Sequence, residues 1–148
     1  MSGPEHYLTH RIRVGLPPEQ AFELFTPSGE TRWDPGWEPR FPRPGPDDTV
    51  PGTVFETAAD GRVTTWVVIA REAGRRVAYA RVTPGSHAGT VEVTLTPAPA
   101  GGSDVTVTYQ LTGLGGTSAP DLAEFAAGYP AFIDSWQEAI ATALRQMR

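Results

Sequence analysis

Residues 122–148 read LAEFAAGYPAFIDSWQEAIATALRQMR, and more than any other segment they indicate the architecture of the chain. Their apolar side chains recur at spacings of three and four, the period of an amphipathic helix. The apolar positions are Leu122, Phe125, Ala126, Tyr129, Phe132, Ile133, Trp136, Ile140, Ala143, Leu144 and Met147. A helix of about 27 residues would be about 40 Å long. We expect a kink at Tyr129-Pro130, because proline has no backbone N–H to donate.

Upstream of this helix the sequence predicts a meander of strands. Stretches rich in Val, Thr, Tyr and Trp span residues 54–57, 63–71, 76–83, 90–96 and 104–112. Short breaks with Gly or Pro separate them, which indicates antiparallel pairing. In the last stretch the apolar side chains alternate with threonine and glutamine, so one face of the sheet is apolar. Such a face needs a cover, and the long helix supplies it.

The N-terminal third combines one more strand with a short helix and a long loop. Alternating apolar residues from Leu8 to Leu16 predict a strand, and Pro17-Pro18 ends it. Residues 21–25 then have the pattern of a short amphipathic helix. The following proline-rich residues 28–51 carry Trp33, Trp37 and Phe41, which a solvated linker would lack. We therefore expect an ordered loop packed on the body of the protein.

Three local patterns resemble one known superfamily. They are LPPEQAFELF at residues 16–25, WDPGWEP at residues 33–39, and the aromatic start of the terminal helix from Tyr129 to Trp136. Together with the order of elements, they resemble the START/polyketide-cyclase-like (SRPBCC) helix-grip superfamily. The resemblance implies an α+β fold over residues 1–148 as a single ligand-binding domain. It implies a curved antiparallel sheet of about six to seven strands wrapped on a long C-terminal helix, with one or two short helices after strand one.

Composition excludes several classes of function. The net charge is −5, which disfavours a nucleic-acid surface. No apolar run is long enough to span a membrane, and the N-terminus lacks the pattern of a signal peptide, so we expect a cytoplasmic protein. All 12 basic residues are arginine, a bias that suggests a GC-rich bacterial genome. Without lysine the chain cannot form a lysine Schiff base.

We expect neither a metal nor a cofactor. The chain has no cysteine. His6 and His10 are four residues apart, but in a strand that spacing separates them by about 13 Å, too far for one ion. The glycine-rich residues 113–118 lack the third glycine of a dinucleotide-binding turn, and no strand follows the next helix.

The resemblance also implies an apolar pocket between the sheet and the helix. The residues expected to line it are aromatic: Trp33, Trp37, Phe55, Trp66, Tyr79, Tyr109, Phe125, Tyr129, Phe132 and Trp136. Ionisable groups in apolar registers are the candidates for catalysis, since burying one is unfavourable unless it has a partner. These candidates are His10, Arg81 and Tyr109. The sequence Gly85-Ser86-His87 has the composition of a turn.

The function expected from this resemblance is the binding of a hydrophobic or aromatic small molecule, lipid or polyketide-like, by a monomer or homodimer. Two alternatives remain open. One is an aromatase/cyclase-type enzyme that positions a polyketide-like chain for ring closure. The other is a protein-interaction module like the co-chaperone domains that share this fold, which would require an exposed aromatic patch near Trp33 and Trp37.

Overall fold

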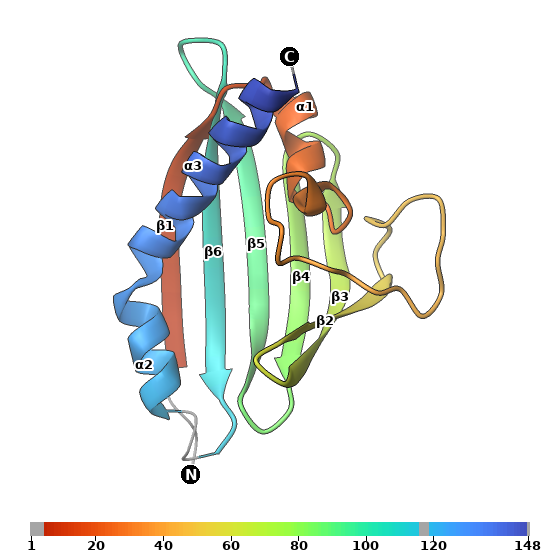
Figure 1. Ribbon diagram of the computed structural model, residues 1–148, viewed down its shortest axis with the longest axis vertical. Coiled ribbons are helices and arrows are strands. Elements are labelled where there is room, and N and C mark those ends of the chain that lie inside the picture. Colours follow the sequence, from red (N-terminus) through yellow and green to blue (C-terminus); the bar gives the residue numbers. More distant parts are fainter. Residues whose placement is uncertain (1–4, 116–118, 148) are drawn as a thin grey trace.

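The structure, a computed structural model, describes residues 5–115 and 119–147. Its described part consists of a curved antiparallel sheet with helices on one face (Figure 1). The strands are β1 (Glu5–Val14), β2 (Val54–Ala59), β3 (Arg62–Glu72), β4 (Arg76–Thr83), β5 (His87–Pro97) and β6 (Ser103–Gly113). The helices are α1 (Pro18–Phe22), η1 (Glu23–Phe25), η2 (Gly29–Arg32), α2 (Ala119–Ala127) and α3 (Tyr129–Gln146).

The sheet has six strands in the order β1-β6-β5-β4-β3-β2, and all neighbours are antiparallel. The first strand therefore pairs with the last, whereas β2 to β6 form the predicted meander. The α+β helix-grip fold is confirmed, with short helices after strand one. The first strand begins earlier than expected and ends at Val14, before Leu16.

Alternation along the strands places one apolar face towards the helices. In β6, Val105, Val107, Tyr109 and Leu111 are buried, while the threonines between them are partly exposed. The helix α3 crosses this face in front of β1 and β6 (Figure 1). Its buried side chains are Tyr129, Ile133, Trp136, Ile140 and Ala143, all from the predicted apolar stripe. The core of the protein lies between this stripe and the sheet.

The predicted single C-terminal helix is in fact two helices, α2 and α3, separated at Gly128. Gly128 has a non-helical backbone with φ −93° and ψ 4°. Pro130 lies in the first turn of α3, where its missing N–H leaves no hydrogen bond unmade. The interruption thus falls directly before the predicted kink. The glycine-rich residues 113–118 lie partly outside the described residues, which omit 116–118.

The proline-rich loop packs on the body at both ends. Trp33 is buried, and Arg40 exchanges two backbone hydrogen bonds of 2.8 Å with Glu56 of β2. At the other end, the Asp47 carboxylate pairs with the guanidinium of Arg71 in β3, and the Asp48 carboxylate accepts a hydrogen bond from the backbone N–H of Ser28, at 2.8 Å. Between these attachments the loop extends away from the sheet (Figure 1). No helix among the described residues is long and apolar enough to cross a membrane.

Candidate functional site

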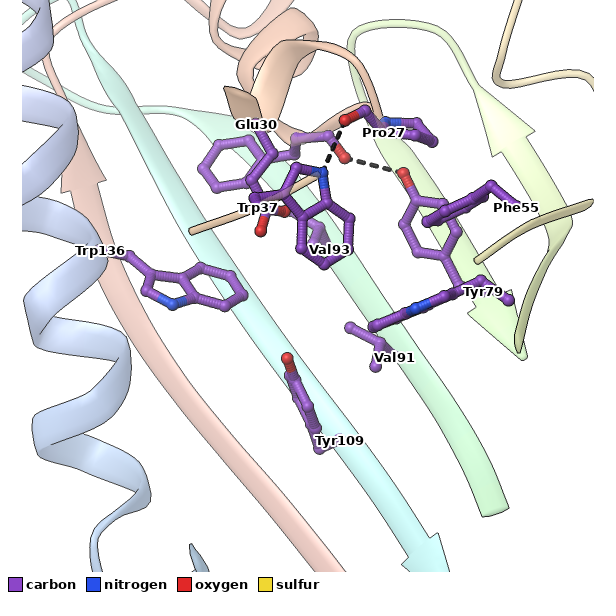
Figure 2. A pocket seen from close by; sticks show the side chains of 11 residues that line it. Pro27, Glu30, Trp37, Phe55, Tyr79, Val91, Val93, Tyr109 and Trp136 are labelled. Carbon is purple, nitrogen blue, oxygen red and sulfur yellow. Dashed lines mark hydrogen bonds between the residues drawn. The ribbon is translucent and has the colours of Figure 1, made fainter. Parts of the chain in front are cut away.

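A small, partly open cavity lies between the sheet, α3 and the segment after β1 (Figure 2). We call it the inner cavity; its volume is ≈ 40 Å³. Its walls are Phe25, Pro27, Glu30, Trp37, Phe55, Trp66, Tyr79, Val91, Val93, Tyr109 and Trp136. Since a water molecule in the liquid occupies about 30 Å³, this space suits a water molecule and not an aromatic ligand.

Contacting rings fill most of the space around the inner cavity. Phe55 and Trp66 stack with centroids 5.6 Å apart and planes 6° from parallel. Trp37 and Tyr79 meet both rings edge-on, with centroids 5.4–6.0 Å apart. Edge-to-face and stacked pairs at these separations are favourable, so the walls are well defined without a ligand.

Hydrogen bonds tie two of these aromatic side chains to the end of η1 and the residues that follow it. The Trp37 indole donates to the Pro27 carbonyl at 2.7 Å, and the Tyr79 hydroxyl donates to the Phe25 carbonyl at 2.8 Å (Figure 2). Burial is the main cause of a pKa of Tyr79 well above its ordinary value. The loop, the segment and the sheet are therefore joined around the cavity.

Glu30 is an ionisable group in the wall of the inner cavity. Burial, followed by the nearby Asp34 carboxylate, raises the pKa of Glu30 to about 8. The tight turn before it requires Gly29, because a Cβ there would lie 1.6 Å from the Glu23 carbonyl oxygen. Thr26 fixes the same turn by accepting a hydrogen bond from the Gly29 N–H, at 3.0 Å. At neutral pH, therefore, the cavity wall carries a mostly uncharged carboxylic acid.

A much larger pocket opens where β3, β4, β5 and β6 meet α2. We call it the outer pocket; its volume is ≈ 570 Å³. Its walls are Ala59, Asp60, Arg62, Thr64, Arg81, Thr83, Ser86, His87, Tyr109, Leu111, Asp121, Leu122 and Phe125. Tyr109 lines both spaces. Small-molecule sites usually have volumes of about 300–1,000 Å³, so this pocket has the size of a ligand site.

The polar part of the outer pocket centres on Arg81 and His87. An Nη2–H of Arg81 donates to Nε2 of His87, at 3.2 Å. Nδ1 of His87 then carries the ring proton and donates to the Ser86 hydroxyl, at 2.9 Å. Burial and the charge of Arg81 lower the pKa of His87 to about 4, so this ring is neutral at physiological pH.

Tyr109 completes this group from β6. Burial raises the pKa of Tyr109 to about 12, although the nearby Arg81 partly opposes that rise. Its hydroxyl therefore remains protonated and can donate a hydrogen bond. The Arg81 guanidinium also lies over the Trp66 ring, 4.5 Å from its centroid. Through Trp66 and Tyr109, the outer pocket adjoins the inner cavity.

Most of the predicted pocket aromatics line one of the two spaces. The inner cavity is lined by Trp37, Phe55, Trp66, Tyr79, Tyr109 and Trp136, and the outer pocket by Tyr109 and Phe125. The other three lie elsewhere: Trp33 packs between Phe25 and Trp136, Tyr129 donates to the Val107 carbonyl at 2.6 Å, and Phe132 is 39% exposed.

The predicted catalytic candidates do not lie together. Arg81 and Tyr109 share the outer pocket. His10 lies on β1, where its Nε2 is 2.8 Å from a carboxylate oxygen of Asp134 in α3. It lines neither the inner cavity nor the outer pocket.

Sequence reasoning missed Glu30, Ser86 and His87. Glu30 lies in η2, a single helical turn too short to show a periodic pattern, so nothing in the sequence indicated that this charge is buried. Residues 85–89 do include a turn, but it precedes β5 directly and places His87 beside Arg81. The short hairpin between β4 and β5 is the signal that could have indicated His87. His87 lies opposite Thr83, and Thr83 follows Arg81 by two residues in β4.

Comparisons with known proteins give one family and several similar structures. Residues 5–145 match the family model described as "Polyketide cyclase / dehydrase and lipid transport". No curated protein matches the chain.

Among solved structures, protein MLL2253 from Mesorhizobium loti has a TM-score of 0.66 and 20% identity, covering 93% of this chain and 98% of its own. The Aha1 dimer from Colwellia psychrerythraea has a TM-score of 0.63 and 18% identity, covering 91% and 96%. DynU16, a putative protein in the dynemicin biosynthetic locus, has a TM-score of 0.65 and 19% identity over 94% of this chain. The match spans 48% of DynU16, about half its length. At 18–20% identity, these similarities show a shared fold and nothing beyond it.

Proposed function

Since the chain belongs to the polyketide cyclase/dehydrase and lipid transport family, within the SRPBCC superfamily, we propose that it binds a hydrophobic or aromatic small molecule in the outer pocket. The observation that carries this proposal is the pocket itself: ≈ 570 Å³, with an apolar side formed by Leu111, Leu122 and Phe125. The other walls are mostly polar, and small-molecule sites combine an apolar surface with polar groups that orient the ligand.

The inner cavity has a supporting part in this proposal. At ≈ 40 Å³ it is too small for the ligand, but it lies directly beyond Tyr109. The rings of Phe55 and Tyr79 hold Trp66 in place, and the ring of Tyr129 packs on Tyr109. A ligand in the outer pocket therefore meets a preorganised wall, which limits the entropy lost on binding.

Ring closure of a polyketide-like chain is a second candidate function, favoured by the shared position of Arg81 and Tyr109. A protonated phenol and a guanidinium in one pocket can both donate to the carbonyl oxygen of a poly-carbonyl chain and stabilise its enolate. Confinement of the chain would supply the rest of the acceleration. Turnover of such a chain by the wild type, and its loss in Tyr109→Phe, would distinguish catalysis from binding alone.

The interaction-module alternative gains less support. It requires an exposed aromatic patch, but Trp33 is 5% exposed and Trp37 packs on Phe55 and Trp66. These tryptophans stabilise the loop and the cavity wall. We therefore place small-molecule binding first.

Titration with the neutral dye Nile red tests the binding proposal. We expect saturable binding of one dye per chain, with a shift in dye emission and quenching of tryptophan fluorescence, because Trp66 adjoins the pocket. Phe125→Arg places a charge on the apolar side and should abolish binding, whereas Phe132→Arg, an exposed position on the neighbouring helix, should not. The absence of saturable dye binding, with no small molecule retained in native mass spectrometry, would refute the proposal.

A further inference from the structure

Arg81 is unusual among the arginines that the structure describes. The others are either exposed or have a carboxylate within ion-pair distance, as Arg76 has in Glu92. Arg81 is largely buried, yet no carboxylate of the described residues lies within that distance. Its Nε is buried and has no hydrogen-bond partner.

The groups that contact Arg81 do not neutralise it. Trp66 contributes the face of its ring, and His87 accepts a hydrogen bond as a neutral ring. Burial lowers the pKa of Arg81, and Tyr109 partly offsets that effect. A guanidinium nevertheless keeps its proton in proteins. The outer pocket therefore contains a partly desolvated positive charge without a counter-ion.

The rest of the outer pocket indicates what could neutralise this charge. Two carboxylates, Asp60 and Asp121, also line the pocket, but both residues are exposed and neither pairs with Arg81. The Tyr109 hydroxyl lies near Arg81 and can donate to an anion beside it. On the other side, Leu111, Leu122 and Phe125 offer an apolar surface. The arrangement has one cationic end and one apolar side.

We propose that the ligand of the outer pocket is an amphipathic carboxylic acid, with its carboxylate at Arg81 and its apolar part against Leu111, Leu122 and Phe125. This inference rests on the proposed function and adds the ligand's chemical class. A guanidinium binds a carboxylate with directed, charge-assisted hydrogen bonds, and Arg81 lines this pocket without a carboxylate partner among the described residues. A neutral lipid or alcohol would leave the buried charge uncompensated.

Displacement of bound Nile red by matched acids and alcohols tests this proposal. The probes are decanoate against 1-decanol, and 2-naphthoate against 2-naphthalenemethanol, all at pH 8 where the acids are ionised. We expect the wild type to bind each acid about tenfold or more tightly than its alcohol, the range for a charged hydrogen bond. Arg81→Met should remove this preference while leaving the alcohols within about twofold of their wild-type affinity.

Two further variants make the result specific. Arg62→Met removes the other arginine of the same pocket, an exposed one, and should keep the preference for acids. Arg81→Lys keeps the charge without the planar donor pattern and should keep part of the preference. Circular dichroism and binding of Nile red itself establish that each variant is folded.

The outcomes separate the two proposals. Equal affinity for acid and alcohol in the wild type would overturn the assignment of Arg81 but leave ligand binding intact. A preference that survives Arg81→Met, or that disappears in Arg62→Met, would also overturn it. Failure of Nile red and of all four probes to bind would refute the binding function itself.

Discussion

The guanidinium carbon of Arg81 lies 4.5 Å from the centre of the Trp66 ring, and the two residues are direct cross-strand partners on β3 and β4. Trp66 also stacks on Phe55 and donates its indole N–H to the Thr57 hydroxyl at 3.0 Å. One aromatic side chain thus lines the inner cavity and supports the cation of the outer pocket. A change at Trp66 should therefore affect both spaces.

Replacing Arg81 should not weaken the ligand-free protein. We expect Arg81→Met to leave the free energy of unfolding unchanged or to raise it by up to about 2 kcal/mol, because an apolar side chain of similar length replaces a desolvated charge without a counter-ion. Urea denaturation without ligand measures this change. The control is Arg76→Met, which breaks the ion pair with Glu92 and should lower stability by up to about 1 kcal/mol. A loss above about 1 kcal/mol in Arg81→Met would indicate a structural cation.

Glu30 should make the protein less stable as the pH rises. Its folded pKa of about 8 exceeds its ordinary value of 4.5. Between these values the folded state holds the proton more tightly than the unfolded state. The contribution of the neutral acid is thus fully present below pH 4.5 and is lost as the pH rises towards 8.

Removing this titration should therefore stabilise the protein at alkaline pH. The free energy of unfolding of Glu30→Gln, relative to that of the wild type, should increase by on the order of 3 kcal/mol from pH 5 to pH 9. Each pKa unit corresponds to about 1.4 kcal/mol. Urea denaturation at both pH values measures the difference, with the exposed Glu23→Gln as control. Equal pH dependence in Glu30→Gln and the wild type would mean that Glu30 is solvated and ionised.

Trp136 on α3 should stabilise the fold mainly through the burial of its ring. It lies against Trp33 and Phe132, with ring centroids 5.4 and 5.5 Å away, and it lines the inner cavity. We expect Trp136→Ala to lower the free energy of unfolding by about 3–5 kcal/mol, the range for emptying a buried large aromatic site. In the same denaturation assay Phe132→Ala, at an exposed position, should lose about 1 kcal/mol. Similar losses in both variants would contradict this packing of α3.

Periodic residues made most of the fold predictable. The alternation in β5 and β6 and the three-four spacing of Tyr129, Ile133, Trp136 and Ile140 each identify a buried face, because burial repeats with the geometry of the element. The division of the terminal helix at Gly128 was less accessible. Glycine and proline together indicate an interruption, but only tertiary packing decides whether the helix bends or ends.

The candidate site was predictable only in part, because it depends on non-periodic residues. Arg81 and Tyr109 stood out as polar side chains in apolar registers. Glu30 and His87 did not, since each owes its position to a loop or turn that brings it to the end of a strand or helix. The split into a small inner cavity and a larger outer pocket depends on ring packing between distant segments, which no local pattern encodes.

The loop that contains Trp37 should behave as a part of the binding site. Trp37 is half-buried against Trp66 and Phe55, and its N–H binds the Pro27 carbonyl. We expect Trp37→Ala to weaken Nile red binding about tenfold, because Trp66, which supports the wall next to the outer pocket, loses one of the rings that hold it. The free energy of unfolding should fall by only about 1–2 kcal/mol, since the side chain is partly exposed.

Proteolysis provides an independent measure of the same loop. Arg40 is tied to Glu56 by two backbone hydrogen bonds, whereas the bond after Arg43 precedes Pro44, where trypsin does not cut. Cleavage after Arg40 should be slow in the wild type, slower with Nile red bound, and about tenfold faster in Trp37→Ala, because losing an anchor favours local opening. Phe41→Ala is the matched control: its ring contacts Phe55 but not Trp66, so it should speed cleavage while leaving dye affinity nearly unchanged. If Nile red leaves the cleavage rate unaltered and Trp37→Ala binds the dye as well as the wild type, the loop is only a tether between η2 and β2.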